Sequence, residues 1–437
     1  MAFSSTNLPN RIRDPVHGFI HLSDSEMRLI DRPEFQRLRR IRQLAFTSLV
    51  YPGAVHTRFE HSLGVLELAT RMFEHIEKQT EPEIWHEQLL SRLKIEGLDR
   101  DKSLQVLRLA ALLHDIGHLP FSHAGEGILP SGQKHEHLSV AIARSLTKEI
   151  DSLFFDGATE KAVHLINPDG MESPTELLFL RGLVSGQIDA DRCDYLLRDS
   201  LYCGVSYGRF DVERLIESLC MVSTDEGMSL GIGKGGLHAV EALIFARYYM
   251  FSQVYFHRTR RLFDHYVSEY LPLALPQTVG SDPLAVLEWD DYRVLDKMRS
   301  DANRGDPASA ASMLWFRGAA SGKHTAIYES SQSPGRVLEN RVRNKVEHIR
   351  DECPDYQIFL DAPRGKIHEF HVEESEEQNG HLLWVTDRRM KRPALITRES
   401  TVIRSIPRRF SLVRAYAYAS QNELEQIKER LGSVEGA

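Results

Sequence analysis

Apolar residues recur at helical spacing through most of the first 275 residues. In the segment 61–79 they fall on one face of a helix, at Leu63, Leu66, Ala69, Phe73 and Ile76. The segment 103–115 repeats this pattern, and His114 continues its apolar face. Further helices are predicted over 24–44, with an interruption near Pro33, and over 182–200, 211–221 and 235–271. This spacing predicts a helical domain.

Two other parts of the chain have an alternating pattern. The stretch RDPVHGFIHLS, residues 13–23, combines alternation with turn residues and predicts a short β-hairpin or extended segment. After residue 353 alternation dominates, in the segments 356–363, 366–372, 382–387, 394–406 and 411–419. A last helix is predicted after Ser420, which forms a capping box with Glu423. The sequence thus predicts a mainly α protein, with a helical domain over 1–275, a partly helical connector over 276–352 and a smaller C-terminal α+β module over 353–437.

Composition narrows the class of protein. The chain has 437 residues, enough to bury a large core, and no apolar run is long enough to cross a bilayer. Its net charge of -8 argues against sequence-independent nucleic-acid binding, which normally needs a basic surface. The N-terminus lacks the layout of a secretion signal, and no CxxC pair or metal-ligand spacing connects Cys193, Cys203, Cys220 and Cys353. We therefore expect a cytoplasmic protein without disulfides and without a membrane partner.

The stretch HDIGHLPFSH, residues 114–123, holds three histidines and an aspartate directly after an apolar helix. Packing alone explains this poorly, because each buried imidazole needs hydrogen-bond partners. A metal ion bound by converging imidazoles and carboxylates explains it better. His114 and Asp115 are the first candidate ligands, and HTRFEHSLGV adds His61. One further carboxylate is available on a later predicted helix, at Asp189, Asp191, Asp194 or Asp199.

These motifs together resemble a known family. HTRFEHSLGV, LLHDIGHLPFSH, KHEHLS and IDADRCDYLLRD are similar to motifs of the HD-domain phosphohydrolases. The likeness is strongest to the deoxynucleoside triphosphate triphosphohydrolase branch, which includes dGTPase-like and SAM-and-HD-domain-like enzymes, and it extends over residues 11–265. It implies a helical HD-domain core that hydrolyses deoxynucleoside triphosphates to deoxynucleoside and tripolyphosphate.

The resemblance implies one divalent metal ion bound by His61, His114, Asp115 and Asp191. Two neutral imidazoles and two carboxylates would make a neutral site around such an ion, with positions left for water and a phosphate oxygen. Mixed nitrogen and oxygen ligands suit manganese, iron or zinc, and suit magnesium less well.

The same resemblance assigns catalytic roles to the surplus histidines. His123, oriented by Glu126, is expected to protonate the leaving 5′-oxygen, because an imidazole titrates near neutrality. His118 and His135 are expected to bind phosphate oxygens. The family usually has Asp where this chain has Glu126, which keeps the charge and lengthens the side chain.

Substrate contacts also follow from the resemblance. Three arginines are expected at the phosphates, namely Arg58, Arg192 and Arg261. Tyr195 and Asp199 follow Asp191 at intervals of four residues on one helical face, and they are expected at the sugar and its 3′-hydroxyl. Gln43 and Leu44 are expected to border the sugar and base.

A nucleotide activator and alternative functions complete the predictions. The resemblance implies an allosteric nucleotide site, in a homo-oligomer (dimer or tetramer), at Asp31, Gln36, Arg39 and Arg214. One alternative is another HD-type phosphohydrolase, acting on nucleoside monophosphates, cyclic nucleotides or alarmones. A second is a single-strand nuclease, and a third is a non-catalytic protein that keeps the site for binding.

Overall fold

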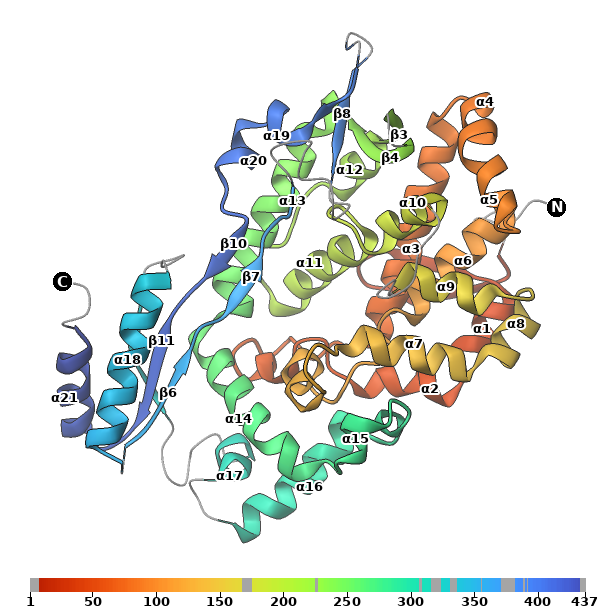
Figure 1. The fold of residues 1–437 in the computed structure, drawn as a ribbon. Coiled ribbons are helices and arrows are strands. Elements are labelled where there is room, and N and C mark those ends of the chain that lie inside the picture. The colour runs from red at the N-terminus through yellow and green to blue at the C-terminus, as the bar shows by residue number, and fades with distance from the viewer. Residues whose placement is uncertain are drawn as a thin grey trace. The chain divides into compact units, whose positions relative to one another are not determined.

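The structure is a computed structural model, shown in Figure 1, which describes residues 8–166, 175–224, 227–305, 309–315, 324–330, 336–354, 356–370, 382–387, 390 and 392–432. Helices predominate and the sheets are small, which confirms the mainly α fold class. The chain divides into two compact units, each assembled from separated segments. The first unit comprises Met1–Arg247, Pro276–Tyr292 and Glu369–Ile406, and the second comprises Tyr248–Leu275, Arg293–His368 and Pro407–Ala437. The three-part division expected from the sequence stays a prediction.

The first unit begins with the expected hairpin, formed by antiparallel strands β1 (Asn10–Asp14) and β2 (Gly18–Leu22). Helix α1 (Asp24–Ile30) follows and is opened by a capping box between Ser23 and Glu26. Helix α2 (Pro33–Gln36) starts at the proline that interrupts the helical pattern, and a 3₁₀ turn (Arg37–Arg40) follows it.

Three helices of the first unit carry the motifs: α3 (Arg58–Gln79), α6 (Arg100–Leu113) and α11 (Ala190–Cys203). Helix α3 packs against both α6 and α11. At Gly64 a Cβ atom would lie only 1.9 Å from the Asp194 carboxylate, so only glycine allows α3 and α11 to approach this closely. The predicted helical segments 61–79 and 103–115 are therefore central elements of this unit.

The first unit contains further helices and one sheet. The helices are α4 (Pro82–Ile84), α5 (Ser91–Ile95), α7 (His135–Ser145), α8 (Thr147–Leu153), α9 (Ala158–Ile166), α10 (Thr175–Val184), α12 (Val212–Ser218), α13 (Leu237–Met250, whose last three residues belong to the second unit), α15 (Thr278–Ser281), α19 (Ile396–Glu399) and α20 (Thr401–Ser405). A sheet of order β3-β4-β8-β9 joins β3 (Leu219–Thr224), β4 (Gly227–Gly233), β8 (Trp384–Thr386) and β9 (Ala394–Leu395). Only the β4–β8 pairing is parallel.

The second unit contains the helices α14 (Arg258–Ala274), α16 (Asp291–Arg304, whose first two residues belong to the first unit), α17 (Ala310–Trp315) and α18 (Arg336–Glu352), and the last helix α21 (Gln421–Gly432). Its main sheet has the order β5-β11-β6, formed by β5 (Thr325–Glu329), β11 (Arg414–Tyr418) and β6 (Gln357–Asp361). Helices α18 and α21 lie beside β11 and β6 in Figure 1, and Val342, Ile349 and Leu431 are buried in the core they share. Strands β7 (Arg364–Lys366) and β10 (Arg409–Ser411) form a separate antiparallel pair.

Several local predictions were wrong. The helix predicted over 235–271 is interrupted, since α13 ends at Met250 and α14 begins at Arg258. The segment 394–406 forms a two-residue strand and then two short helices, because Ile396, Ser400 and Ile403 are buried at helical spacing and the Ser400 hydroxyl accepts the Ile403 amide at 3.0 Å. The segment 182–200 is not one helix, since α10 ends at Val184 and α11 begins after Asp189. The segment 211–221 is helical only to Ser218, because strand β3 begins at Leu219 and pairs with the next strand, β4.

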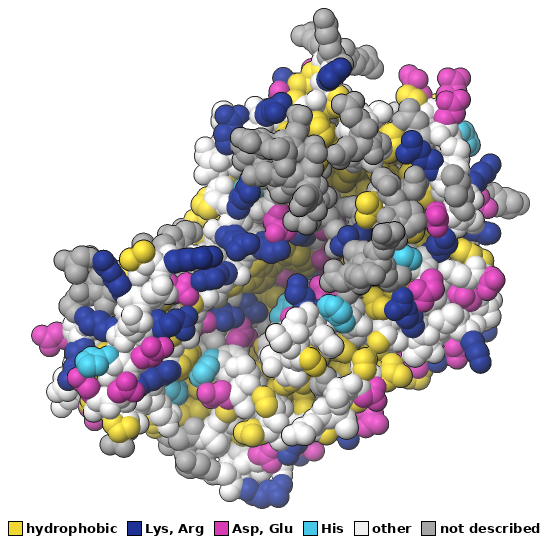
Figure 2. Space-filling view, in the orientation of Figure 1, with side chains coloured by type: hydrophobic (Ala, Val, Ile, Leu, Met, Phe, Trp, Pro, Cys, Tyr) yellow, Lys and Arg dark blue, Asp and Glu magenta, His cyan; other side chains and the backbone are white. Residues whose placement is uncertain are grey.

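Among the described residues, no helix combines the length and apolar composition needed to span a membrane. On the face drawn in Figure 2, Lys and Arg side chains are interspersed with Asp and Glu side chains. This mixed surface agrees with the modest negative charge of the sequence.

Candidate metal centre

Three helix ends bring the predicted metal ligands together. Helix α3 begins at Arg58 because Glu60 accepts the Thr57 amide at 2.8 Å, which places His61 in its first turn. Helix α6 ends at Leu113, so His114 and Asp115 directly follow its last residue. Helix α11 begins after Asp189, whose carboxylate accepts the Arg192 amide at 2.7 Å, and Asp191 therefore sits in the first turn.

The four side chains converge on one point. His61 Nε2 lies 3.1 Å from an oxygen of Asp191 and 3.6 Å from an oxygen of Asp115. His114 Nε2 lies 3.4 Å from the other oxygen of Asp115 and 3.9 Å from Asp191. His61 and Asp115 are buried, whereas Asp191 is about one-third exposed. The group is therefore open to solvent on the Asp191 side.

The donor set fits a divalent metal ion. Among the described residues, neither His61 Nε2 nor His114 Nε2 has a hydrogen-bond partner, although both atoms are buried. His114 Nδ1 lies 2.8 Å from the Ala111 carbonyl oxygen, which can only accept, so its Nε2 carries the free lone pair. Burial disfavours a charge on His61, but the carboxylates of Asp191 and Asp194 outweigh it and raise the pKa of His61 to about 10. The centre therefore attracts positive charge, as a metal site does.

Asp194 orients the His61 ring through Nδ1, the nitrogen that faces away from the candidate metal position. Its oxygen Oδ2 lies 2.7 Å from His61 Nδ1, and its Oδ1 lies 2.6 Å from the Nε2 atom of His17 in the N-terminal hairpin. Arg198 donates to both oxygens at 2.9 Å, and Asp14 accepts from the same guanidinium at 2.8 Å. This arrangement fixes His61 with Nε2 directed to the metal position.

Replacing Asp194 by asparagine should weaken metal binding by roughly 10–100-fold, the usual cost of losing an outer-shell carboxylate. Four donors surround its two oxygens, so the amide nitrogen of an asparagine must face at least one of them. Metal titration measures the effect. Asp14→Asn is the control, because it removes a carboxylate from Arg198 but none from His61. Equal metal affinity in the wild type and Asp194→Asn would contradict the assigned role.

Arg58 connects Asp115 to the loop that follows it. Its Nη1 atom donates to Asp115 at 2.7 Å, and its Nε donates to the Ser122 hydroxyl at 3.0 Å. Burial opposes a charge on Asp115, but Arg58 and His114 hold the pKa of this carboxyl well below its usual range. Asp115 is therefore a carboxylate, as a metal ligand requires.

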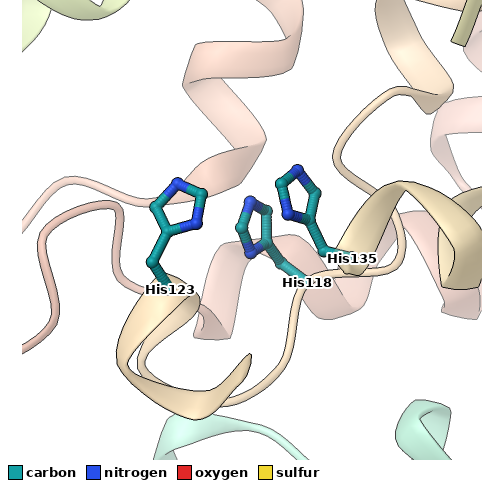
Figure 3. A group of neighbouring side chains, drawn as sticks. All are labelled: His118, His123 and His135. Carbon is teal, nitrogen blue, oxygen red and sulfur yellow. The ribbon is translucent and has the colours of Figure 1, made fainter. Parts of the chain in front are cut away.

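Three further imidazoles, those of His118, His123 and His135, form a second group, as Figure 3 shows. The rings of His118 and His135 stack with centroids 3.7 Å apart, and His123 meets each ring edge-on at 5.0 and 5.2 Å. His118 and His135 approach Asp115 to 3.3 and 3.6 Å. Gly117 allows the loop to reach α7, because a Cβ atom there would lie 2.3 Å from the Ser139 nitrogen.

The three histidines differ in environment. Burial and the charge of Arg58 hold the pKa of His118 well below its usual range, and neither of its ring nitrogens has a hydrogen-bond partner among the described residues. Glu126 accepts from His135 at 2.6 Å and from His123 at 2.9 Å. Burial opposes a charge on His135, but Glu126 raises its pKa. The His123 side chain is 62% exposed, so it alone of the three faces solvent.

Other predicted substrate residues lie on the same unit. Asp191, Tyr195 and Asp199 follow one face of α11, and Arg192 lies 3.2 Å from Asp189. His56, which the sequence did not single out, lies with Nε2 2.7 Å from Asp199, and its carbonyl accepts the amide of Gln43 at 3.0 Å. Thus His56 connects two predicted sugar contacts. The next residue, Leu44, is buried.

Arg261 is not brought to this centre by any described contact. It lies on α14 in the second unit, where Asp361 accepts from it at 2.6 Å and Asp264 at 3.3 Å. A buried arginine of the first unit, Arg247 on α13, was missed by the sequence analysis. Its charge lies near Tyr195 and Arg192, and burial lowers its pKa. No sequence motif distinguished Arg247 from other helical arginines.

The predicted allosteric residues come from several elements of the first unit. Gln36 accepts from Arg39 at 2.9 Å, and the Arg39 guanidinium lies 3.5 Å from the centroid of the Phe59 ring. Asp31 is the exposed C-cap of α1, and Arg214 on α12 donates to the Gly235 carbonyl at 3.0 Å. No described contact joins Arg214 to the other three.

Comparisons with known proteins agree with this geometry. The HD domain model matches residues 58–199, and the HD associated region model matches residues 210–363. An uncharacterized protein of Methanocaldococcus jannaschii is 37% identical over 293 residues, which cover 67% of this chain and 55% of that protein. The deoxynucleoside triphosphate triphosphohydrolase SAMHD1 homolog of Dictyostelium discoideum is 31% identical over 281 residues, covering 61% of this chain and 50% of that protein.

The chain spans about half the length of the curated relatives it matches. A crystal structure of a hypothetical protein from Aquifex aeolicus superposes with a TM-score of 0.75 at 26% identity, covering 97% of this chain and 99% of that one. The family expected from the motifs is confirmed. Because the two family matches run from residue 58 to residue 363 with only 200–209 between them, the chain belongs to the HD-domain proteins that carry the HD associated region.

Proposed function

We propose that the chain is a metal-dependent hydrolase that converts deoxynucleoside triphosphates to deoxynucleoside and tripolyphosphate. Membership of the HD-domain family supports phosphohydrolase activity in general. One observation carries the finer proposal: the candidate centre adjoins three imidazoles and a buried arginine that the metal does not need. These groups suit several phosphate oxygens and a leaving group rather than a metal alone.

The metal would be held by His61, His114, Asp115 and Asp191. When bound, a divalent ion polarises a phosphate oxygen and lowers the pKa of a bound water. The mixed nitrogen and oxygen donors suit manganese, iron or zinc. The buried Nε2 atoms of His61 and His114, which have no hydrogen-bond partner among the described residues, support this assignment.

The chain's own residues bind the phosphates and supply a proton. His118 is neutral and unpaired within the described residues, so an N–H of its ring is available to a phosphate oxygen. Glu126 raises the pKa of His135 and so favours its charged form, which suits a second phosphate contact. His123 shares Glu126, lies at the solvent-facing side and delivers the proton to the 5′-oxygen of the leaving deoxynucleoside.

The sugar is assigned to the same helix as Asp191. Tyr195 and Asp199 follow it by one and two turns, and His56 connects Asp199 to the segment of Gln43 and Leu44. Arg192 and Arg247 supply positive charge next to Tyr195. The role of Arg261 at the phosphates rests on the family resemblance alone.

Hydrolysis of another phosphate ester is the competing function. Several relatives are uncharacterized, whereas those of Dictyostelium discoideum and Danio rerio are named deoxynucleoside triphosphate triphosphohydrolases. Incubation of the protein with Mn²⁺ and each dNTP, nucleoside monophosphate and cyclic nucleotide, followed by chromatography, separates the two. Deoxynucleoside plus tripolyphosphate supports the proposal. Turnover of the other esters, with none of any dNTP under any nucleotide activator, contradicts it.

A nucleotide activator bound at Asp31, Gln36, Arg39 and Arg214 remains part of the proposal, together with a dimer or tetramer. Arg39→Ala and Arg214→Ala should each reduce the stimulation of activity by added nucleotides, because both remove an exposed cation. Stimulation and oligomeric state are measured by activity assay and light scattering. Arg71→Ala, which removes the surface arginine paired with Glu213, is the control. Unchanged stimulation and assembly in both variants would remove this site.

A further inference from the structure

Residues 116–123, called the histidine loop below, run from Asp115 into a 3₁₀ helix (Ser122–Ile128) and have a strained backbone at two positions. Phe121 and Ser122 have φ values of 61° and 56°, in the left-handed region that residues other than glycine rarely adopt. Such a conformation persists only when neighbouring groups hold it. His118 and His123 lie on this loop, so the groups that hold it also set their positions.

Asp291 is one group that holds the loop. Its Oδ1 atom accepts the amide of Phe121 at 2.8 Å, and its Oδ2 accepts the amide of Arg42 at 2.9 Å. The side chain is 2% exposed. The Ser122 hydroxyl completes the connection by donating to the Arg42 carbonyl at 2.7 Å. One buried carboxylate thus joins the histidine loop to the segment that carries Gln43.

Arg37 also contacts both the histidine loop and the segment 289–291 that carries Asp291. Its guanidinium donates to the carbonyl oxygens of Trp289 at 2.7 Å, Ile116 at 3.3 Å and His118 at 2.6 Å. The side chain is fully buried. Three carbonyls in a fixed geometry match the planar donors of arginine, which a lysine does not reproduce.

We propose that Asp291, with Arg37, is a positioning residue that fixes the loop 116–123 so that His118 and His123 meet the phosphates. The proposal rests on the proposed function. Residues 289–291 lie in the HD associated region, whereas the loop lies in the HD domain. The associated region therefore completes the catalytic loop from outside the domain that carries the metal ligands.

Asp291→Asn tests the proposal with little change in size. The amide nitrogen of the asparagine must face one of the two backbone donors, so one hydrogen bond is lost. We expect kcat to fall by roughly 10–100-fold, because small misplacements of reacting groups are costly, with KM and metal content close to wild type. Hydrogen exchange of residues 116–123 should become faster. Asp290→Asn is the matched control. It changes the aspartate next to Asp291, and the carboxylate of Asp290 pairs with the partly exposed Arg40 at 2.5 Å.

A second variant tests the proposal if Asp291→Asn folds poorly, and a second ligand tests it if no dNTP is hydrolysed. Arg37→Lys should show the same loss of kcat and the same faster exchange if Asp291→Asn folds poorly by thermal denaturation. Wild-type kcat or unchanged exchange in the folded variants would overturn the proposal. If the wild-type protein hydrolyses no dNTP, the proposed function fails. Calorimetry with tripolyphosphate then decides: weaker binding to Asp291→Asn than to Asp290→Asn supports the positioning role, and equal binding overturns it.

Discussion

Replacing Asp115 by asparagine should abolish metal binding and turnover together. Asp115 offers one oxygen to the His61 side of the centre and the other to His114, and both lie within 3.6 Å of an imidazole nitrogen. An asparagine has almost the same size, so the pocket should keep its shape while losing the charge. The loss of affinity should exceed the roughly 10–100-fold expected for an outer-shell change. Metal content by mass spectrometry and metal titration measure it.

The asparagine variant also leaves Arg58 without its carboxylate, so a loss of stability must be separated from a loss of metal. Thermal denaturation without metal gives the first quantity. Asp101→Asn is the matched control, because it changes a half-exposed aspartate near the start of the same helix α6. If Asp115→Asn bound one equivalent of metal and kept full turnover, the metal centre would lie elsewhere.

Replacing His123 by alanine should lower kcat by roughly 10²–10⁴-fold, the usual range for a lost general acid. Its ring is 62% exposed and bonded to Glu126, so removal leaves the buried core unchanged. Metal content and nucleotide binding should stay at the wild-type level. Single-turnover kinetics on a dNTP measure the effect on the chemical step.

A matched pair elsewhere in the chain serves as the control for this substitution. His238 lies 2.7 Å from Glu241 at the same i,i+3 spacing and is 91% exposed, far along the sequence from the metal ligands. His238→Ala should have wild-type kcat. Equal kcat for His123→Ala and the wild type would exclude His123 as the general acid. A loss of metal in His123→Ala would instead assign it to the metal centre.

The sequence indicated the residues proposed to bind the metal more clearly than the residues that contact and support them. His61, His114 and Asp115 belong to short sequence motifs, because each lies in the first turn of a helix or directly after its last turn. Their supports come from distant segments: His17 from the N-terminal hairpin, and Asp291 from the associated region. No local pattern reveals such contacts, since they depend on tertiary packing.

The same difference between local sequence patterns and long-range contacts applies to the fold. Helices α3 and α6 follow from apolar periodicity and from their caps. The parallel pairing of β4 with β8 does not, because it joins residues about 150 positions apart, such as Gly231 and Trp384. In 394–406, alternation suggested a strand where the Ser400 cap and the buried face specify helices.

Hydrolysis of a dNTP in ¹⁸O-labelled water tests the central claim most directly. Attack of water on the α-phosphorus breaks the bond between that phosphorus and the 5′-oxygen. Mass spectrometry should then find one ¹⁸O atom in the tripolyphosphate and none in the deoxynucleoside, with both products absent in Asp115→Asn. Deoxynucleoside monophosphate with pyrophosphate, or label in the deoxynucleoside, would contradict a one-step cut at the α-phosphate by this centre.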